Sequence, residues 1–308
     1  MSATSPLTGA FARADRLAAA VGRLPGRRRR RLPFSPWHLV LIPATIVLLF
    51  PFAWLVVTSL ETTSESLHFP PILVPHVIRF ANYSDALSQA PFVHWLVNSA
   101  VVAVGTVLCN LVLCTLAGYA FARFRFLGRT FLFAVILATL MVPFQVTMIP
   151  WFIITKWLGV HLLAGVGINT IGALILPNAA TGFGIFFMRQ FFRTLPLEYE
   201  ESARVDGASR LTVLLRIVLP LAAPPLATLA ALTFLDSWNN FLWPLIAVTS
   251  TGQMTLPLGL ATFQGAHATD WPLLMAGNVM SLVPMLAVFL IAQRYFIRSV
   301  AATGLAGT

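Results

Sequence analysis

The sequence has little charge for its length. Only 10% of its 308 residues are Asp, Glu, Lys or Arg, whereas soluble globular domains have nearer a quarter. Hydrophobic residues make up 58%, and several apolar runs reach the roughly 20 residues that a helix needs to cross a hydrocarbon core about 30 Å thick. This composition excludes an ordinary soluble domain and predicts a multi-pass integral membrane protein.

Lysine is almost absent, since Lys156 is the only one in the chain. A P-loop requires the pattern Gly-x-x-x-x-Gly-Lys-Ser/Thr, because its lysine and its backbone amides hold the phosphates. Lys156 stands outside that pattern. We therefore expect no cofactor bound by this chain and no Walker-type ATPase activity of its own.

Cysteine and histidine are also scarce. Cys109 and Cys114 fall in one apolar run, where a spacing of i, i+5 on a helix turns their side chains apart. A disulfide between them is therefore not expected. The six histidines are scattered, and no pair has metal-ligand spacing within a span. The sequence predicts no catalytic residue and no metal site, and it gives an intramembrane enzyme no support.

Six transmembrane helices are predicted, so the expected fold class is all-α, a polytopic helix bundle. They occupy residues 37–59, 94–121, 129–152, 168–191, 217–247 and 272–296. Proline and polar residues interrupt most of them, as Asn98, Asn110 and Pro143 do. Backbone groups freed in a membrane helix are satisfied by neighbouring helices or by water, so these interruptions favour a bundle packed around a wet path.

The formal net charge of +10 is concentrated on one side of the predicted membrane. Eight arginines lie in an N-terminal basic arm, and only Arg79 and Lys156 fall in loops of the opposite side. Positive charge favours the cytoplasmic side, so both termini and the loop 194–220 are expected there. We interpret the arm as a topology signal that touches anionic lipid rather than nucleic acid. The predicted parts are the arm, a six-span domain and a short tail, at residues 1–36, 37–304 and 305–308.

The expected cytoplasmic loop contains a charged, helix-prone segment, "EESARVDGASRLTVLLRIVLP", at residues 200–220. A helix is expected to begin near Thr194 and Pro196. The Asp-Gly pair at 206–207 is a turn signal, and Ser209 is a suitable cap for a second helix. Two short helices joined by a turn are therefore predicted. On composition alone, a solvated amphipathic connector remains an open interpretation.

The spacing of this segment resembles the Glu-Ala-Ala loop of ATP-binding-cassette (ABC) importer permeases. The matching residues are Glu201, Ser202, Ala203, Asp206, Gly207, Ile217, Leu219 and Pro220. Ser202 stands where the family more often has alanine, and both are small. Three further stretches resemble the carbohydrate-uptake branch, in particular the second permease of maltose-type systems: "FLDSWNNFLWPLIAV" (234–248), "TLPLGLATFQG" (255–265) and "QRYFIRSVAATG" (293–304).

The resemblance implies a type I ABC importer permease in a bacterial cytoplasmic membrane. Its first loop helix would fit a cleft on a partner ATPase, where Glu201 meets basic or backbone donors, Ser202 and Ala203 permit close approach, and Gly207 allows the bend. The implied partners are a homologous companion permease, two ATPase subunits that hold ATP and Mg²⁺, and an extracytoplasmic solute-binding protein. The last outer loop, 248–271, is either a plain connector or a segment that reaches the binding protein.

The predicted fifth span carries a polar face made by Asp236, Asn239 and Asn240, at i, i+3 and i+4. A charge in a span costs about 2.5–3.5 kcal/mol on insertion scales, so this face should meet protein or water. Two interpretations stay open: interhelical hydrogen bonding, or a lining for a hydroxyl-rich substrate to which Trp238 or Trp243 offers an aromatic surface.

The substrate class follows less directly. A phosphate-bearing substrate would favour arginine in the lining, but the span interiors contain none. This favours a neutral mono-, di- or oligosaccharide over glycerol-3-phosphate. A glycerol-3-phosphate or polyol permease of the same branch is the alternative. A secondary transporter that uses Asp236 as an ion site would be favoured by inverted repeats, and none is evident in the sequence.

Overall fold

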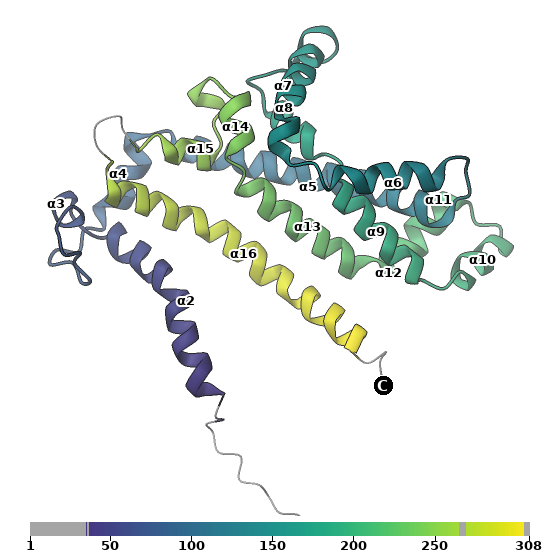
Figure 1. Ribbon diagram of the computed structural model, residues 1–308, viewed down its shortest axis with the longest axis horizontal. Coiled ribbons are helices and arrows are strands. Elements are labelled where there is room, and N and C mark those ends of the chain that lie inside the picture. The colour runs from purple at the N-terminus through teal and green to yellow at the C-terminus, as the bar shows by residue number, and fades with distance from the viewer. Residues whose placement is uncertain (1–34, 36, 265–268, 305–308) are drawn as a thin grey trace, which may run out of the picture. The chain divides into compact units, whose positions relative to one another are not determined.

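The computed structural model of the protein describes residue 35, residues 37–264 and residues 269–304, with side chains as far as residue 293. The tail and nearly all of the basic arm lie outside the described residues. The chain divides after Pro51 into two units, and each is described by itself. Within the described residues every regular element is a helix, apart from one isolated bridge between Gln264 and Thr269 (Figure 1). The predicted all-α class is confirmed.

Helix α2, His38–Ser59, provides the helical part of the first unit and continues into the second. Its bounds agree with the predicted span 37–59. The helix stays continuous although Pro43 and Pro51 lie inside it.

Three helices are each long and apolar enough to cross a membrane: α2, α5 (Phe92–Arg123) and the Trp271–Gln293 portion of α16 (Trp271–Gly304). Three further pairs qualify only if each bent pair counts as one span. The pairs are α6 (Arg129–Thr139) with α7 (Phe144–His161), α8 (Ile171–Ile175) and η2 (Leu176–Asn178) with α9 (Gly182–Thr194), and the Arg210–Leu221 stretch with α13 (Ala223–Trp238). The described chain therefore has three to six spans.

The bends have identifiable causes. α6 and α7 meet at 106°, and Pro143 stands at the break in extended conformation, where it cannot continue a helix. The pair that ends in α9 bends by 47°, and Thr181 caps α9 by accepting a hydrogen bond from the Gly184 amide. The pair that ends in α13 bends by 78°. Each of these three predicted spans is therefore bent at a break between its helices.

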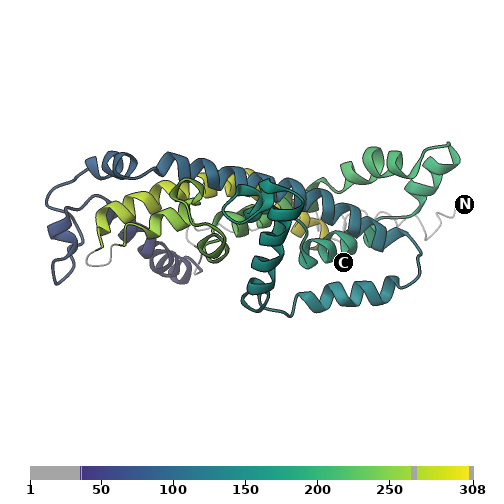
Figure 2. The ribbon, with the colours of Figure 1, turned by 90° about the horizontal axis from the view of Figure 1, so that it is seen from above.

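Helix α5 is the central element of the second unit, and α9 and α13 pack along it (Figures 1 and 2). Close approach depends on small residues, since a Cβ atom at Gly118 would stand 2.8 Å from Met188 Cβ and one at Gly184 would stand 2.7 Å from Cys114 Sγ. Cys109 and Cys114 are both free thiols, as predicted. Glycine at such contacts lets membrane helices pack closely.

Polar side chains inside the spans tie these helices together. The Asn110 amide donates to Asn178 O at 3.0 Å and to Thr181 Oγ1 at 3.2 Å. Its Oδ1 accepts a hydrogen bond from Thr233 Oγ1 at 3.4 Å. One asparagine of α5 therefore links α9 and α13 to the central helix.

The described part of the predicted outer loop 248–271 is packed on the N-terminal half of α5. Trp95 Nε1 donates to Thr251 O at 3.2 Å, and the Asn98 amide donates to the carbonyls of Gly252 and Met254 at 2.9 Å each. The helices in and beside this loop are α14 (Leu242–Ala247), η4 (Thr251–Gln253) and α15 (Leu256–Ala261). The segment 249–255 is therefore fixed to α5 rather than free.

At the same end of α5 lie the short helices α3 (Thr63–Ser66) and α4 (Ala81–Gln89). The Asn82 amide of α4 donates to the carbonyls of Ser59 and Glu61 at 2.9 and 2.8 Å. The Glu61 side chain is buried, and its Oε1 has no hydrogen-bond partner within the described residues.

The segment 194–220 forms two short helices joined by a turn, as predicted. α10 spans Glu198–Val205, and α11 spans Arg210–Val213. Ser209 caps the N-terminus of α11, because its hydroxyl oxygen accepts a hydrogen bond from the Thr212 amide at 3.2 Å. A π-helical stretch, Leu214–Val218, and α12, Leu219–Leu221, lead into α13. The predicted start near Thr194 and Pro196 lies slightly before the observed one, because α9 continues through Thr194 and α10 begins at Glu198.

Candidate coupling site

α10 lies against the C-terminal end of α5, at the opposite end of that helix from α4 (Figures 1 and 2). One face of α10 turns inward: Glu200 is 6% exposed, and Ala203 is half-buried. The other face carries the exposed residues Glu201, Ser202 and Val205. The helix therefore has a fixed face and a free face.

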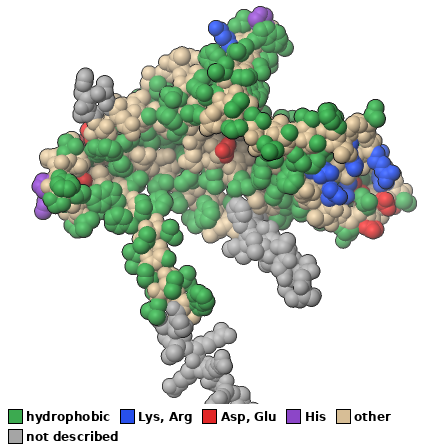
Figure 3. Space-filling view, in the orientation of Figure 1, with side chains coloured by type: hydrophobic (Ala, Val, Ile, Leu, Met, Phe, Trp, Pro, Cys, Tyr) green, Lys and Arg blue, Asp and Glu red, His purple; other side chains and the backbone are tan. Residues whose placement is uncertain are grey.

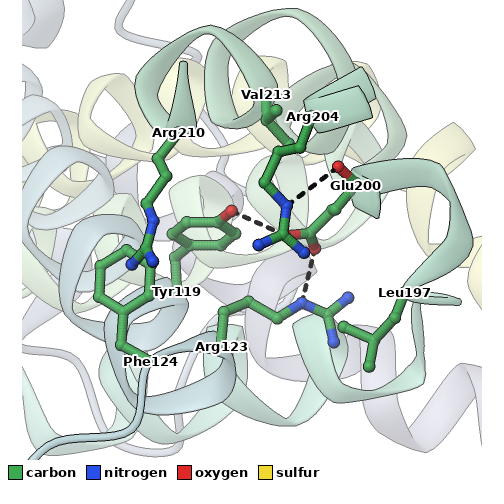
Figure 4. Close-up of a pocket in the computed structure, with 8 residues that line it drawn as sticks. All are labelled: Tyr119, Arg123, Phe124, Leu197, Glu200, Arg204, Arg210 and Val213. Atoms are coloured by element: carbon green, nitrogen blue, oxygen red, sulfur yellow. Dashed lines mark hydrogen bonds and ion pairs between the residues drawn. The ribbon is translucent and has the colours of Figure 1, made fainter. Parts of the chain in front are cut away.

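A buried ion pair holds the fixed face. Arg123, the last residue of α5, donates from Nε to Glu200 Oε1 at 2.6 Å, and Tyr119 donates its hydroxyl proton to Glu200 Oε2 at 2.8 Å (Figure 4). Arg123 also donates from Nη2 to the Leu195 carbonyl at 2.8 Å. The two charged side chains are each 8% exposed. Removing one partner of such a pair costs about 3–5 kcal/mol, because the other charge stays buried and unpaired.

Aromatic packing extends this support to α11. The Tyr119 ring meets Phe124 and Phe192 edge to face, with centroid distances of 5.6 and 5.7 Å. The Arg210 guanidinium lies 4.9 Å from the centroid of the Phe124 ring, a cation–π contact. The end of α5 thus contacts both short helices of the segment.

The predicted coupling residues divide by exposure. Glu201, Ser202, Asp206 and Gly207 are exposed, and Ala203 is half-buried. Beside them Val205 is 88% and Tyr199 56% exposed. Apolar side chains gathered with charges on an exposed helix are typical of a surface that contacts another protein.

Gly207 is required by its backbone conformation. Its φ is +84°, in the left-handed region, where a Cβ atom is disfavoured and only glycine fits without strain. A Cβ atom there would meet nothing within 4 Å, so space does not select glycine. The predicted need for backbone freedom at this turn is confirmed.

The last residues of the motif face the bundle more than solvent. Ile217 and Leu219 are half-buried, and Pro220 is exposed. Their neighbours Val213 and Val218 are buried in a cluster that also contains Leu214, Met188 and Phe192. This half of the motif joins the exposed helix to the membrane bundle.

The candidate substrate residues lie where α13 ends. The helix stops at Trp238, so the predicted continuous helix through 217–247 is wrong. The chain turns at Asn239 and Asn240. Asn240 Oδ1 accepts a hydrogen bond from the Trp243 amide, in the first turn of α14, at 3.3 Å. Asp236 is exposed on α13 and makes no ion pair with any described residue.

Asn239 is exposed, whereas both tryptophan candidates are packed inside the chain. Asn239 donates to the Leu235 carbonyl at 2.8 Å. Trp238 and Trp243 are 2% and 1% exposed, and their indole nitrogens donate to the carbonyls of Ser281 and Ala173. Neither ring faces a surface of this chain, so both tryptophans lie in its core rather than at the predicted aromatic lining.

Arg189 lies near the end of the predicted span 168–191, in the last part of α9. Arg189 of α9 lies with its Cζ 3.8 Å from the centroid of the Phe133 ring, and its Nε donates to the Phe121 carbonyl at 3.4 Å. Arg189 thus contacts residues of both α5 and α6.

Sequence reasoning missed Tyr119, Arg123 and the buried role of Glu200. In the sequence, Glu200 is one of three neighbouring glutamates, and nothing local marks it as buried. The available signal was the i, i+4 pair of Tyr119 and Arg123 at the end of a span, opposite a loop with three glutamates.

Comparison with known proteins bears on this arrangement. Residues 114–302 match the family of binding-protein-dependent transport system inner membrane components, and this stretch covers more than half of the chain. The chain belongs to this family. As a member it is a membrane component of a transport system, and the resemblance to importer permeases predicted from the loop motif is confirmed.

Relatives of this family member extend along nearly the whole chain. The arabinooligosaccharides transport system permease protein AraQ of Halalkalibacterium halodurans is 34% identical, over 91% of this chain and 100% of its own length. The lactose transport system permease protein LacG of Rhizobium radiobacter is 34% identical, over 88% of this chain and 96% of its own.

The fold is also found among solved structures. A chain of a bacterial ABC transporter involved in the import of the acidic polysaccharide alginate matches 96% of this chain and 100% of its own length, with a TM-score of 0.74 and 22% identity. The importer-permease fold predicted from the sequence is confirmed.

Proposed function

We propose that this chain is the permease subunit of a binding-protein-dependent ABC importer, that it forms half of the translocation path for a sugar, and that it receives the work of ATP hydrolysis through α10. The observation that carries the proposal is the division of α10 into two faces. Glu200 fixes the inner face to α5, while Glu201, Ser202 and Val205 stay exposed on the outer face.

This geometry suits a lever. A partner that binds the exposed face of α10 and moves this helix would also move the end of α5, because the buried ion pair of Arg123 and Glu200 joins the two helices. Gly207 sets the turn to α11, and Ile217 and Leu219 join the segment to α13. The proposed partners are two ATPase subunits that hold ATP and Mg²⁺, a homologous companion permease and an extracytoplasmic solute-binding protein.

The proposed location is a bacterial cytoplasmic membrane, with α10 and both termini on the cytoplasmic side. On the face shown in Figure 3, most basic side chains gather over the end that carries α10 and α11, as the positive-inside rule expects of a cytoplasmic end. Reporters fused after residues 25 and 205 should read cytoplasmic, and one near residue 75 should read external. An external signal at 205 would contradict the coupling proposal.

A sugar is the proposed substrate class because two relatives carry arabinooligosaccharide and lactose transport in their names. A glycerol-3-phosphate or polyol permease is the alternative within the same branch. Labelled arabinooligosaccharides, lactose and glycerol-3-phosphate, offered to vesicles that contain the complete transporter, would distinguish these classes by which one is accumulated.

The decisive experiment reconstitutes the chain with its companion permease, ATPase and binding protein. ATP-driven uptake and stimulation of ATP hydrolysis by loaded binding protein are measured for wild type and for Glu201→Lys, with Glu198→Lys as the matched control. We expect Glu201→Lys to insert normally and to lose both activities. Uptake driven by an ion gradient without ATP, abolished by Asp236→Asn, would instead favour a secondary transporter.

A further inference from the structure

Beside the buried ion pair lies a hollow lined by three guanidinium groups and one carboxylate (Figure 4). We call it the arginine pocket, after Arg123 of α5, Arg204 of α10 and Arg210 of α11. Phe124 and Leu197 complete much of its wall. The proposed coupling function does not use this hollow.

The arginine pocket has more hydrogen-bond donors than acceptors. Both carboxylate oxygens of Glu200 are occupied, one by Arg123 and one by Tyr119. Arg204 makes one long contact, from Nε to the Glu200 carbonyl at 3.4 Å. Arg210 lies over Phe124 and donates no hydrogen bond to any described residue. Since a guanidinium carries five N–H donors, most of those in the pocket have no acceptor among the residues that the structure describes.

The net charge of the pocket is positive, which also favours an anionic ligand. Glu200 is the only acidic residue among its lining side chains, and Arg123 already neutralises it. Arg204 and Arg210 therefore contribute unmatched positive charge from two different helices. The planar fork of a guanidinium suits the oxygens of a phosphate group, with which it forms paired, charge-assisted hydrogen bonds.

We infer that the arginine pocket binds a phosphate group, supplied either by the headgroup of an anionic phospholipid or by free phosphate. Its surroundings suit a membrane interface, because Arg123 ends a helix long enough to span and the nearby loop exposes Leu127 fully and Phe126 by 40%. At the rim, Leu197 is 49% exposed. Basic residues just beyond a span attract anionic headgroups of the cytoplasmic leaflet, and this cytoplasmic placement rests on the proposed function.

A phosphate held there would connect α5, α10 and α11 across the Gly207 turn. It would restrain the two short helices from the side opposite the exposed face of α10. Through this contact the lipid composition would affect how rigidly α10 and α11 are held against α5.

The test uses the complete transporter in nanodiscs of phosphatidylcholine, with or without phosphatidylglycerol. Retained phosphatidylglycerol is counted by native mass spectrometry, and inorganic phosphate is titrated separately in the phosphatidylcholine discs. The double variant Arg204→Gln/Arg210→Gln should lower the affinity for the phosphate source by at least tenfold, since each lost charged hydrogen bond is worth about tenfold or more. Arg216→Gln is the control, because Arg216 is exposed on the same segment and does not line the pocket.

A second variant keeps the test independent of charge and folding. Leu197→Trp would narrow the entrance while every arginine stays in place, and it should reduce binding of the same probe. Loss of phosphatidylglycerol alone assigns the pocket to lipid, and loss of inorganic phosphate alone assigns it to free phosphate. Unchanged binding of both probes in the double variant and in Leu197→Trp would overturn the inference. Sugar uptake is scored separately, so failure of the transport proposal would be visible as such.

Discussion

Arg123 and Glu200 are 77 positions apart in the sequence, yet Arg123 Nε lies 2.6 Å from Glu200 Oε1. The contact joins the last residue of α5 to the first turn of α10. Tyr119, one helical turn before Arg123, occupies the second carboxylate oxygen. The exposed helix is thus attached to the longest fully described helix of the bundle by a carboxylate whose two oxygens each accept a hydrogen bond from that helix.

Replacing Glu200 with alanine should weaken the attachment of α10 to α5, while the helix itself still forms. The buried Arg123 guanidinium would lose its counter-charge, at a cost of about 3–5 kcal/mol. Amide hydrogen exchange across residues 198–213 should rise markedly, and stimulation of ATP hydrolysis by loaded binding protein should fall. Glu198→Ala, at an exposed position of the same helix, is the control and should leave both unchanged. Wild-type exchange in Glu200→Ala would show that the ion pair does not hold α10.

Gly207→Val should damage the turn through its backbone. A β-branched residue at φ +84° costs about 1–3 kcal/mol in strain, so the turn between α10 and α11 should open. We expect normal insertion and strongly reduced ATP-driven uptake. Gly252→Val is the matched comparison, since that glycine also has free space around it but no positive φ. Equal uptake in the two variants would indicate that the turn conformation is irrelevant.

Asp236→Asn should affect sugar uptake without changing stability, whereas Asn240→Ala should lower stability. Asp236 is exposed and without an ion pair among the described residues, so its change should leave thermal unfolding in detergent unaffected while altering uptake if it lines the path. Asn240→Ala removes the acceptor for the Trp243 amide and should cost about 0.5–2 kcal/mol, as lost caps do. Wild-type uptake by Asp236→Asn over a range of sugar concentrations would make this face structural.

Glu61→Gln should stabilise the protein at neutral pH. Burial, assisted by repulsion from Glu65, raises the pKa of the Glu61 carboxyl above its ordinary value of 4.5. Below pH 4.5 the group is protonated in both folded and unfolded chains, so its contribution to stability is fully present. That contribution is lost as the pH rises through the raised pKa. The melting temperature of wild type in detergent should therefore fall over this window more than that of Glu61→Gln. Parallel curves would show that Glu61 is not protonated preferentially in the folded state.

Hydropathy located apolar helices, because each of the six predicted windows overlaps at least one observed helix, and three of them overlap a helix long and apolar enough to cross a membrane by itself. It could not find the bends. Asn239 and Asn240 suggested a helical face, but α13 ends at Trp238 with Asn239 as its C-cap, and Asn240 Oδ1 accepts a hydrogen bond from the Trp243 amide. The outcome depends on where one side-chain oxygen finds a backbone amide, which an i, i+4 pattern does not contain.

The loop motif predicted which residues of α10 are exposed, since Glu201 and Ser202 both face solvent. It did not predict which glutamate is buried. Glu200 and Glu201 are chemically alike and adjacent, and only the arrival of Arg123 and Tyr119 from α5 distinguishes them. Such a choice is made by tertiary contacts between distant parts of the chain and leaves no local trace.

The packing of segment 249–255 on α5 has a thermodynamic consequence. Trp95 and Asn98 hold that segment at one end of the helix, and Arg123 holds α10 at the other end, about 40 Å away at 1.5 Å per residue. If a ligand at one end and a ligand at the other both prefer the same position of this rod, each strengthens the binding of the other. Linkage makes the effect reciprocal: the factor by which an external protein strengthens binding at α10 equals the factor by which binding at α10 strengthens the hold on the external protein.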